Sequence, residues 1–293
     1  MATIVSKSKR PRGGQSGRVG GGERRAPIGV FDSGIGGLTV AAALRGVLPA
    51  EDIFYIGDTA RVPYGGKSAA TIQRYSREIS ALLLEESAKV IVVACNSASA
   101  LALPKLRGEL GVPVVGVIEP GALAAVKATR SGKIGVIGTR ATIFSQAYER
   151  AIHALSPEVE VVSEACPLLV PLIEEGWLKD PVSDAVIARY LERLVRAKID
   201  TLVLGCTHYP LLRRAIKRFV GRAITLVDSA DNCAEAVREL LGERGLAAPK
   251  SRRGRLQVAM TDATGAFLRV AEEALGLQVG DVQLRTVQTG ALG

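Results

Sequence analysis

Short runs of apolar, mainly β-branched residues recur along the chain, and each gives way to glycine and small polar residues. Such runs, about four to eight residues long and bounded by turn residues, are typical of parallel strands buried on both faces. Amphipathic stretches lie between them; residues 71–87, for example, place Ile72 and Ile79 on one helical face. The alternation predicts parallel sheets whose strands are joined by right-handed helical crossovers.

The same alternation sets the expected elements from residue 28 onward. Strands are expected at 28–31, 53–56, 90–94, 113–118 and 201–204, and helices at 38–47, 71–87, 98–110, 183–197 and from 231 onward. Residues 57–68 are rich in glycine, proline and other turn residues and are expected to form a long loop. Residues 256–259 and 264–274 are expected to return to the first set of strands.

Similar segments recur after slightly more than one hundred residues. Residues 28–30 match 134–136 at an offset of 106, Cys95 matches Cys206 at 111, and the strand ending at Glu119 matches that ending at Asp228 at 109. Three matches in one order at nearly one offset indicate an internal duplication, and so long a period indicates two domains rather than a solenoid. We therefore predict an α/β fold of two similar doubly wound parallel-sheet domains, related by a pseudo-twofold axis, with the active site in the cleft between them.

Charge and repeats together set the expected domain boundaries. The chain has 293 residues and a net charge of +9, but residues 1–25 hold seven Lys and Arg against one Glu, which leaves +3 for the rest. We predict a disordered basic tail at 1–26, which can contact polyanions weakly without binding a specific nucleic acid. The first domain is expected at 27–120 plus 229–293, and the second at 121–228.

Hydropathy and cysteine content narrow the class of protein. No apolar stretch reaches the roughly 18 uninterrupted residues of a membrane span, so no membrane insertion is expected. Four cysteines are too few for a disulfide scaffold in a chain of this length, which favours free thiols in a reducing cytoplasm. For Cys166 and Cys233 we expect the ordinary role of small buried hydrophobic residues.

Two of the cysteines occupy matching positions at the ends of buried runs. Cys95 follows VIVVA and precedes Asn96 and Ser97, whereas Cys206 follows TLVLG and precedes Thr207 and His208. A helix N-terminus after each strand would lower the thiol pKa, and its free N–H groups would bind a carboxylate. The pattern predicts two acid/base thiols, each beside a carboxylate cradle.

Six motifs together carry a resemblance to a known family. FDSGIGGLT, YIGDTARVPYG, ACNSAS, VIEPGA, VPLIEEG and LGCTHYPLL occur in this order between residues 28 and 228. In this set the chain resembles the glutamate racemases, cofactor-independent enzymes that make D-glutamate for peptidoglycan. The resemblance implies interconversion of L- and D-glutamate by two thiols, with neither pyridoxal phosphate nor a metal ion. We also expect a cytoplasmic homodimer.

The resemblance assigns roles to particular residues. It implies a catalytic group consisting of Cys95, Cys206, Asp32, His208 and Glu174, and a substrate-binding group consisting of Asp32, Ser33, Tyr64, Gly65, Asn96, Ser97, Thr207 and His208. Asp32 would lie beside Cys95 and contact the substrate amino group, and His208 would exchange a proton with Cys206. Glu174 would lie on the side of the second cysteine, with Glu175 as the neighbouring alternative. Asp58 would line the cleft.

Two alternatives stay open beside this interpretation. Cys95, Cys206 and His208 can instead form a metal or redox site, although zinc sites normally show closely spaced ligand pairs and only Cys206 and His208 are close in sequence. An aspartate racemase is the nearest competitor within the racemases. In aspartate racemases the motif around the second cysteine resembles GCTE, whereas this chain has GCTHYP. His208 therefore favours a glutamate racemase over an aspartate racemase.

Overall fold

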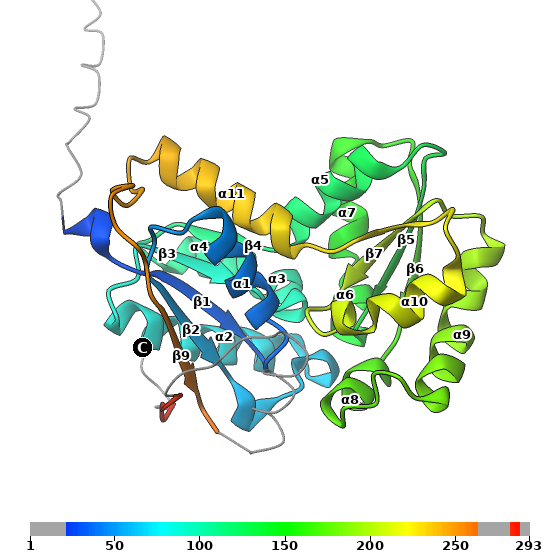
Figure 1. Ribbon diagram of the computed structural model, residues 1–293, viewed down its shortest axis with the longest axis horizontal. Helices are drawn as coiled ribbons and strands as arrows, with labels where there is room; N and C mark the ends of the chain where they lie inside the picture. The colour runs from blue at the N-terminus through cyan, green and yellow to red at the C-terminus, as the bar shows by residue number, and fades with distance from the viewer. Residues whose placement is uncertain (1–21, 263–281, 288–293) are drawn as a thin grey trace, which may run out of the picture.

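The computed structural model describes residues 22–262 and 282–287, whose strands form two separate parallel sheets (Figure 1). The first sheet has the order β10 (Gln283–Leu284), β9 (Leu256–Met260), β2 (Ile53–Gly57), β1 (Ile28–Asp32), β3 (Val90–Val93) and β4 (Val114–Gly116). The second has the order β6 (Glu160–Ala165), β5 (Lys133–Gly138), β7 (Thr201–Gly205) and β8 (Thr225–Val227). The order β2-β1-β3-β4 thus recurs as β6-β5-β7-β8, and the predicted fold class is confirmed.

Helices cover both faces of each sheet. Against the first sheet, α1 (Leu38–Val47) and α11 (Ala230–Glu243) pack on one face, and α2 (Ala69–Glu85), α3 (Asn96–Leu101) and α4 (Leu103–Glu109) on the other. Against the second, α5 (Ile118–Ala128) and α7 (Ala147–Leu155) oppose α8 (Leu169–Glu174), α9 (Pro181–Arg196) and α10 (Arg213–Val220), while α6 (Arg140–Phe144) follows β5. Double coverage explains why the central strands are apolar at nearly every position.

A repeated glycine marks the close approach of a neighbouring segment to each central strand. A Cβ at Gly29 in β1 would lie 2.9 Å from Cβ of Ala88, and one at the matching Gly135 in β5 would lie 2.5 Å from Cδ1 of Ile199. Both positions require the absence of a side chain, because the packed interior has no room for the added carbon. The duplicated sequence therefore preserves a packing requirement as well as an apolar pattern.

Two expected elements differ from the observed ones. The helix expected at 98–110 is divided into α3 and α4, with Ala102 between them and Pro104 in the first turn of α4. Proline lacks the amide hydrogen that an uninterrupted helix needs, and it is accommodated at a helix start. The strand expected at 113–118 ends at Gly116, because Ile118 already begins α5. The expectation for 264–274 lies outside the described residues.

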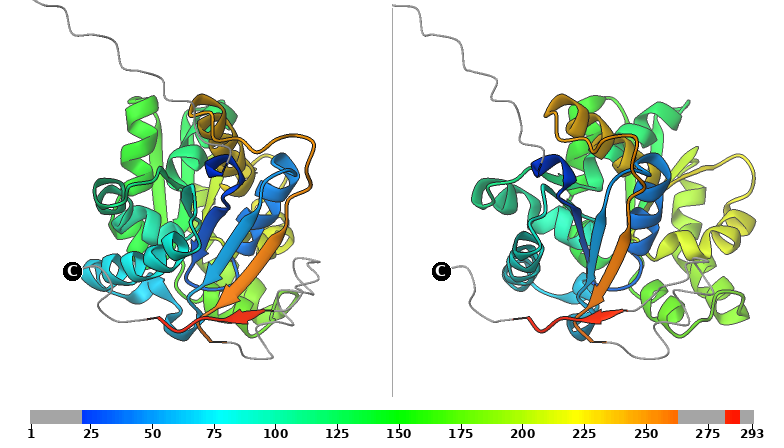
Figure 2. Two further views of the ribbon diagram at one scale, coloured as in Figure 1. Left: turned by 90° about the vertical axis from the view of Figure 1, so that its left-hand side faces the viewer. Right: turned by 60° about the vertical axis from the view of Figure 1, so that its left-hand side comes forward.

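The chain returns to the first sheet after β8. The helix α11 packs against α1, and β9 pairs in parallel with β2 from Ile53↔Leu256 to Gly57↔Met260. Figure 2 shows β9 lying beside β2 in both views, so a late segment forms part of the sheet that begins with β1. Within the described residues, no helix is long and apolar enough to cross a membrane.

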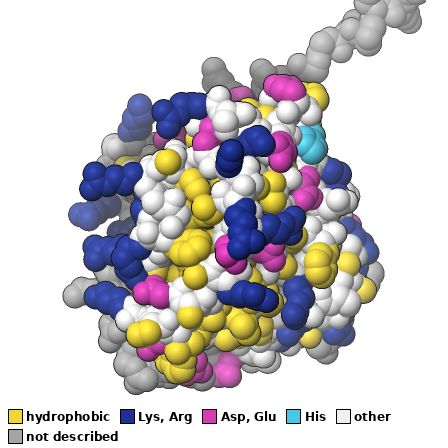
Figure 3. Space-filling view, turned by 90° about the vertical axis from the view of Figure 1, so that its right-hand side faces the viewer, with side chains coloured by type: hydrophobic (Ala, Val, Ile, Leu, Met, Phe, Trp, Pro, Cys, Tyr) yellow, Lys and Arg dark blue, Asp and Glu magenta, His cyan; other side chains and the backbone are white. Residues whose placement is uncertain are grey.

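The surface on the side of α9 carries a mixture of charges. Figure 3 shows basic side chains on this face interspersed with acidic and hydrophobic ones. The helix α9 itself takes part in two ion pairs, Asp184 with Arg218 at 2.8 Å and Arg193 with Glu164 at 3.2 Å. Exposed pairs of this kind contribute roughly 0 to 1 kcal/mol each.

Candidate active site

A small pocket lies where the carboxyl ends of the two sheets face each other. It encloses about 20 Å³ and is lined by Ser33, Pro63, Tyr64, Gly65, Cys95, Asn96, Ser97, Thr139, Val170, Cys206, Thr207 and His208. Both sheets contribute, because Cys95 follows β3 and Cys206 follows β7. Nine of the residues predicted from the sequence line this pocket, while Asp32 and Glu174 lie next to it.

Cys95 occupies the N-cap position of α3 and is almost fully buried. Its Sγ lies 3.8 Å from Oγ of Ser33, the residue that follows β1. Burial, followed by the neighbouring charge of Asp32, raises the pKa of the Cys95 thiol above its ordinary value. The start of the helix does act in the expected direction, because the backbone N–H of Ala98 lowers the pKa of the thiol, but desolvation and the charge of Asp32 outweigh it and the net shift is upward.

Cys206 has a different local structure. The sequence suggested a helix directly after it, but Thr207 and His208 form a turn and a short 3₁₀ helix, η4 (Tyr209–Leu212), comes next. The Sγ of Cys206 lies 3.9 Å from Nδ1 of His208. The partner of the second thiol is thus an imidazole rather than the start of an α-helix.

His208 is buried between Cys206 and the carboxylate of Glu174. Burial lowers its pKa, but contacts with Cys206 and Glu174 outweigh burial and raise the pKa from 6.5 to about 10. The Nε2 of His208 lies 3.3 Å from Oε1 of Glu174, within ion-pair distance but without hydrogen-bond geometry. Glu174 is half-buried and Glu175 is exposed, so Glu174 is the glutamate that contacts this site.

Asp32 is a fully buried carboxylate at the end of β1. Its Oδ2 accepts hydrogen bonds from the backbone N–H of Gly37 at 2.8 Å and from the hydroxyl of Thr207 at 3.3 Å. Its Oδ1 has no partner among the described residues. A Cβ at Gly37 would lie 2.4 Å from Cβ of Asp32, so the glycine allows the backbone to reach the carboxylate. Asp32 retains one oxygen that can accept a donor from a ligand.

Asn96 and Ser97 connect the first sheet to the second. The Oδ1 of Asn96 accepts a hydrogen bond from the hydroxyl of Tyr148 at 2.8 Å, which leaves its Nδ2 without a partner among the described residues. The Oγ of Ser97 lies 2.9 Å from Oγ1 of Thr139, the N-cap residue of α6. Both contacts cross between the two halves of the molecule.

Three further residues line the pocket that were not predicted from the sequence, namely Thr139, Pro63 and Val170. Thr139 follows β5 as Ser33 follows β1, at the offset of 106 that relates those strands. Applying that offset to Ser33 would have predicted it. Val170 carries no reactive group, so only the fold could reveal it.

The loop after β2 forms one wall of the pocket with Pro63, Tyr64 and Gly65. The hydroxyl of Tyr64 donates to Asp58, which directs it away from the pocket. A Cβ at Gly65 would lie 2.5 Å from Cβ of Thr139, so the loop packs closely on the second half of the molecule. Asp58 was expected to line the cleft, but it is fully buried behind Tyr64 and absent from the lining.

Comparisons with known proteins agree with this geometry. A family model described as Asp/Glu/hydantoin racemase matches residues 38–237. The chain belongs to the Asp/Glu/hydantoin racemase family. It is 52% identical over 255 residues to a glutamate racemase of Geobacter metallireducens, covering 87% of this chain and 94% of the relative.

Solved structures of this racemase family superpose over most of the chain. A glutamate racemase isoform from Bacillus anthracis has a TM-score of 0.85 at 40% identity and covers 90% of this chain and 98% of its own. A glutamate racemase from Francisella tularensis in complex with D-glutamate has a TM-score of 0.84 at 36% identity and covers 90% and 99%. The resemblance to glutamate racemases drawn from the six motifs is confirmed.

The metal alternative is not supported by the geometry of this racemase. Within residues 22–262 and 282–287, no three His, Cys, Asp or Glu side chains are grouped so as to hold a metal ion. Cys95, Cys206 and His208 line one pocket, but they do not form a ligand set.

The raised pKa of His208 predicts a pH-dependent contribution to stability. Because folding raises this pKa from 6.5 to about 10, protonated His208 stabilises the folded state. That contribution is fully present below about pH 6.5 and is lost as the pH rises through about 10. We expect His208→Gln to lower the Tm at pH 6 and pH 8, with a smaller difference at pH 10.5. A Tm difference independent of pH would contradict the prediction.

Proposed function

We propose that the chain interconverts L-glutamate and D-glutamate, with Cys95 and Cys206 as the two acid/base groups on opposite faces of the substrate. The observation that carries the proposal is that both thiols line one pocket, each at the end of the matching strand of its own sheet. Racemisation requires an acid/base group on each face of the substrate. The pocket can provide both, because its two faces come from different halves of the molecule.

Racemisation requires removal of the α-proton from one face and delivery of a proton to the other. A single base would have to move around the carbanion, or the substrate would have to turn over. With two bases, one thiolate takes the proton and becomes a thiol, while the opposite thiol donates its proton and becomes a thiolate. The substrate is inverted and the proton count balances. This scheme uses no cofactor.

The carbanion needs oriented donors at the α-carboxylate, where negative charge grows. Ser33, Asn96, Ser97 and Thr207 line the pocket and supply these donors from their side chains or, as for Thr207, whose hydroxyl donates to Asp32, from the backbone N–H. The free Nδ2 of Asn96 is suited to the task, because the hydroxyl of Tyr148 already satisfies its Oδ1 and so fixes the direction of the amide.

Asp32 accepts the substrate ammonium through its free Oδ1 in this proposal. Binding of the ammonium also activates Cys95. Burial raises the pKa of the thiol most, the negative charge of Asp32 raises it further, and a bound cation offsets the repulsion from Asp32. Thiolate formation is therefore linked to the presence of substrate.

We assign opposite hands to the two thiols, following the family resemblance. Cys95, near Asp32, removes the proton from D-glutamate, and Cys206, beside His208 and Glu174, removes it from L-glutamate. Each reaction in D₂O should place deuterium at the α-carbon of the product while the remaining substrate carries little. Equal deuterium content in both enantiomers from the first turnovers would contradict distinct faces.

The test of the function is decay of the circular dichroism signal of L-glutamate with protein stripped of metal ions and cofactors. Racemisation to zero ellipticity supports the proposal, and an inactive protein contradicts it. L-aspartate is the matched competitor, since it is one methylene shorter. Faster turnover of L-aspartate than of L-glutamate would favour the aspartate racemase alternative.

Tyr148 offers a test of the donor arrangement. Tyr148→Phe keeps the ring but releases the amide of Asn96, so we expect kcat/KM to fall by about threefold to tenfold in both directions. The loss should disappear in an Asn96→Ala background, since the two residues act as one unit. Tyr209→Phe is the control, because the hydroxyl of Tyr209 also makes a buried hydrogen bond, of 2.9 Å to the carbonyl of Cys166. Its effect on kcat/KM should add to that of Asn96→Ala.

We further propose that the product supplies peptidoglycan synthesis, as in the glutamate racemases. The homodimer, the cytoplasmic location and the weak polyanion contacts of residues 1–26 stay predictions. Sedimentation velocity tests the homodimer. Binding to heparin, compared between the full chain and a form lacking residues 1–25, tests the polyanion contacts.

A further inference from the structure

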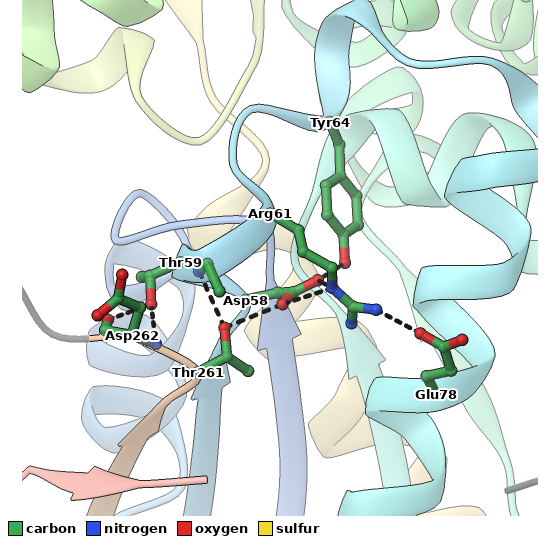
Figure 4. A network of polar contacts seen from close by, with 8 residues as sticks. Asp58, Thr59, Arg61, Tyr64, Glu78, Thr261 and Asp262 are labelled. Atoms are coloured by element: carbon green, nitrogen blue, oxygen red, sulfur yellow. Dashed lines mark hydrogen bonds and ion pairs between the residues drawn. The ribbon is translucent and has the colours of Figure 1, made fainter. Parts of the chain in front are cut away.

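Behind the loop that walls the pocket lies a buried polar network centred on Asp58 (Figure 4). We call it the Asp58 network, and it consists of Asp58, Arg61, Tyr64, Glu78 and Thr261. These residues come from the loop after β2, from α2 and from the end of β9. None of them except Tyr64 lines the pocket, so the network acts on the site only through the loop.

Asp58 receives hydrogen bonds at both carboxylate oxygens. The Nε of Arg61 lies 2.9 Å from Oδ1 and 2.7 Å from Oδ2, the hydroxyl of Thr261 donates to Oδ1 at 3.0 Å, and the hydroxyl of Tyr64 donates to Oδ2. The backbone N–H of Asp58 donates to the carbonyl of Asp32 at 2.9 Å. A fully buried carboxylate needs such partners, so each donor has a defined position.

Arg61 is fixed from three sides. Its Nη1 pairs with Glu78 on α2, and its guanidinium lies 4.0 Å from the ring centroid of Tyr75. The ring of Tyr75 in turn lies 5.6 Å from that of Tyr64. The loop between Asp58 and Gly65 is thereby held at its start by ion pairs and near its end by an aromatic contact.

Thr261 directly follows β9 and joins this strand to the loop. Its hydroxyl donates to Asp58 and accepts the backbone N–H of Ala60 at 3.0 Å. Its own N–H donates to the carbonyl of Gly57 at 3.0 Å. Thr261 is therefore bound to both ends of the turn that begins the loop. It lies outside residues 38–237, which the family model matches.

The position of the loop decides the shape of the pocket. Pro63, Tyr64 and Gly65 line it directly, and Gly65 packs against Thr139 with no room for a side chain. We propose that Thr261 is a positioning residue for the substrate: by fixing Asp58 and Ala60 it holds the Pro63–Gly65 wall at the distance that glutamate requires. The inference rests on the proposed function.

The test compares Thr261→Val, which keeps the shape and removes the hydroxyl, with Thr261→Ser, which keeps the hydroxyl. We expect Thr261→Val to raise KM for both enantiomers by about tenfold, because it removes one hydrogen bond to a charged group. We expect kcat to change by less than about twofold, because the side-chain hydrogen bonds of the two thiols go to Ser33 and His208 and not to the network. Thr261→Ser should restore most of the wild-type KM.

Thr129→Val is the matched control. The hydroxyl of Thr129 also donates to a carboxylate, Oδ1 of Asp200 at 2.7 Å, and also accepts a backbone N–H, that of Gly132 at 3.1 Å. It lies at the opposite end of the second sheet from the pocket, beside the start of β5. We expect a similar loss of thermal stability from Thr129→Val, with KM unchanged.

The outcomes separate the inference from the proposed function. If wild-type protein racemises glutamate and folded Thr261→Val has a wild-type KM, the inference is wrong and the function stands. A raised KM in Thr129→Val as well would also overturn it, since the effect would then be general destabilisation. An inactive wild-type protein would contradict the proposed function itself. If Thr261→Val does not fold, Tyr64→Phe replaces it, because it removes another hydrogen bond to Asp58, and an unchanged KM there overturns the inference.

Discussion

Cys95→Ala and Cys206→Ala should each lower kcat for racemisation by about 10³ or more in both directions while the protein stays folded. A general acid/base group contributes on the order of 10² to 10⁴, and each thiol is needed in both directions, once as base and once as acid. Rates are measured by circular dichroism with each enantiomer. Cys233→Ala is the matched control, because Cys233 is fully buried against α1 and away from the pocket.

The single-thiol variants also test the assignment of hands. With Cys95 removed, Cys206 can still take the proton of L-glutamate and return a solvent deuteron to the same face. We expect α-deuterium to enter L-glutamate with retention in Cys95→Ala, and D-glutamate with retention in Cys206→Ala. Rapid racemisation by either variant would contradict the scheme with two bases.

Asp32→Asn should have opposite effects on activity and on the Cys95 thiol. Loss of the charge that holds the substrate ammonium is expected to lower kcat/KM by about tenfold to a hundredfold. The same change removes a negative neighbour that, after burial, raises the pKa of Cys95, so the thiolate should form more readily. Alkylation of Cys95 by iodoacetamide, followed by mass spectrometry at one pH, should therefore become faster as catalysis becomes slower.

Asp200→Asn is the control for this pair of measurements. Asp200 accepts hydrogen bonds from Thr129 and from the N–H groups of Arg130 and Ser131, which outweigh burial and lower its pKa. Its loss should destabilise the fold without changing the alkylation of Cys95. Slower alkylation in Asp32→Asn would show that Asp32 does not repel the thiolate.

The sequence predicted the parts of the site that repeat. Cys95 and Cys206 could be placed together because equivalent strands end at the same edge of their sheets, and apolar runs identify such strands directly. Contacts between distant segments were not predictable in this way. Tyr148 is 52 residues from Asn96, and Thr261 is 203 from Asp58, and neither stands in a motif that indicates its partner.

The raised pKa of the Cys95 thiol could not be predicted from the sequence either. A helix N-terminus could be expected after Cys95, and the structure has one. How deeply the thiol is buried, and how closely Asp32 approaches it, depend on packing by both halves of the molecule. Desolvation is a property of the folded environment and cannot be derived from neighbours along the chain.

The contact between Ser97 and Thr139 has a consequence for substrate entry. The pocket encloses about 20 Å³, about the space of one water molecule, so we expect the contact between Ser97 and Thr139 to open when glutamate binds. The hydroxyls of Ser97 and Thr139, no longer hydrogen-bonded to each other, can then both donate to the substrate carboxylate. We therefore expect opening and binding to be linked by an exchange of hydrogen-bond partners, in which two hydroxyls that join the halves of the molecule come to bind the substrate.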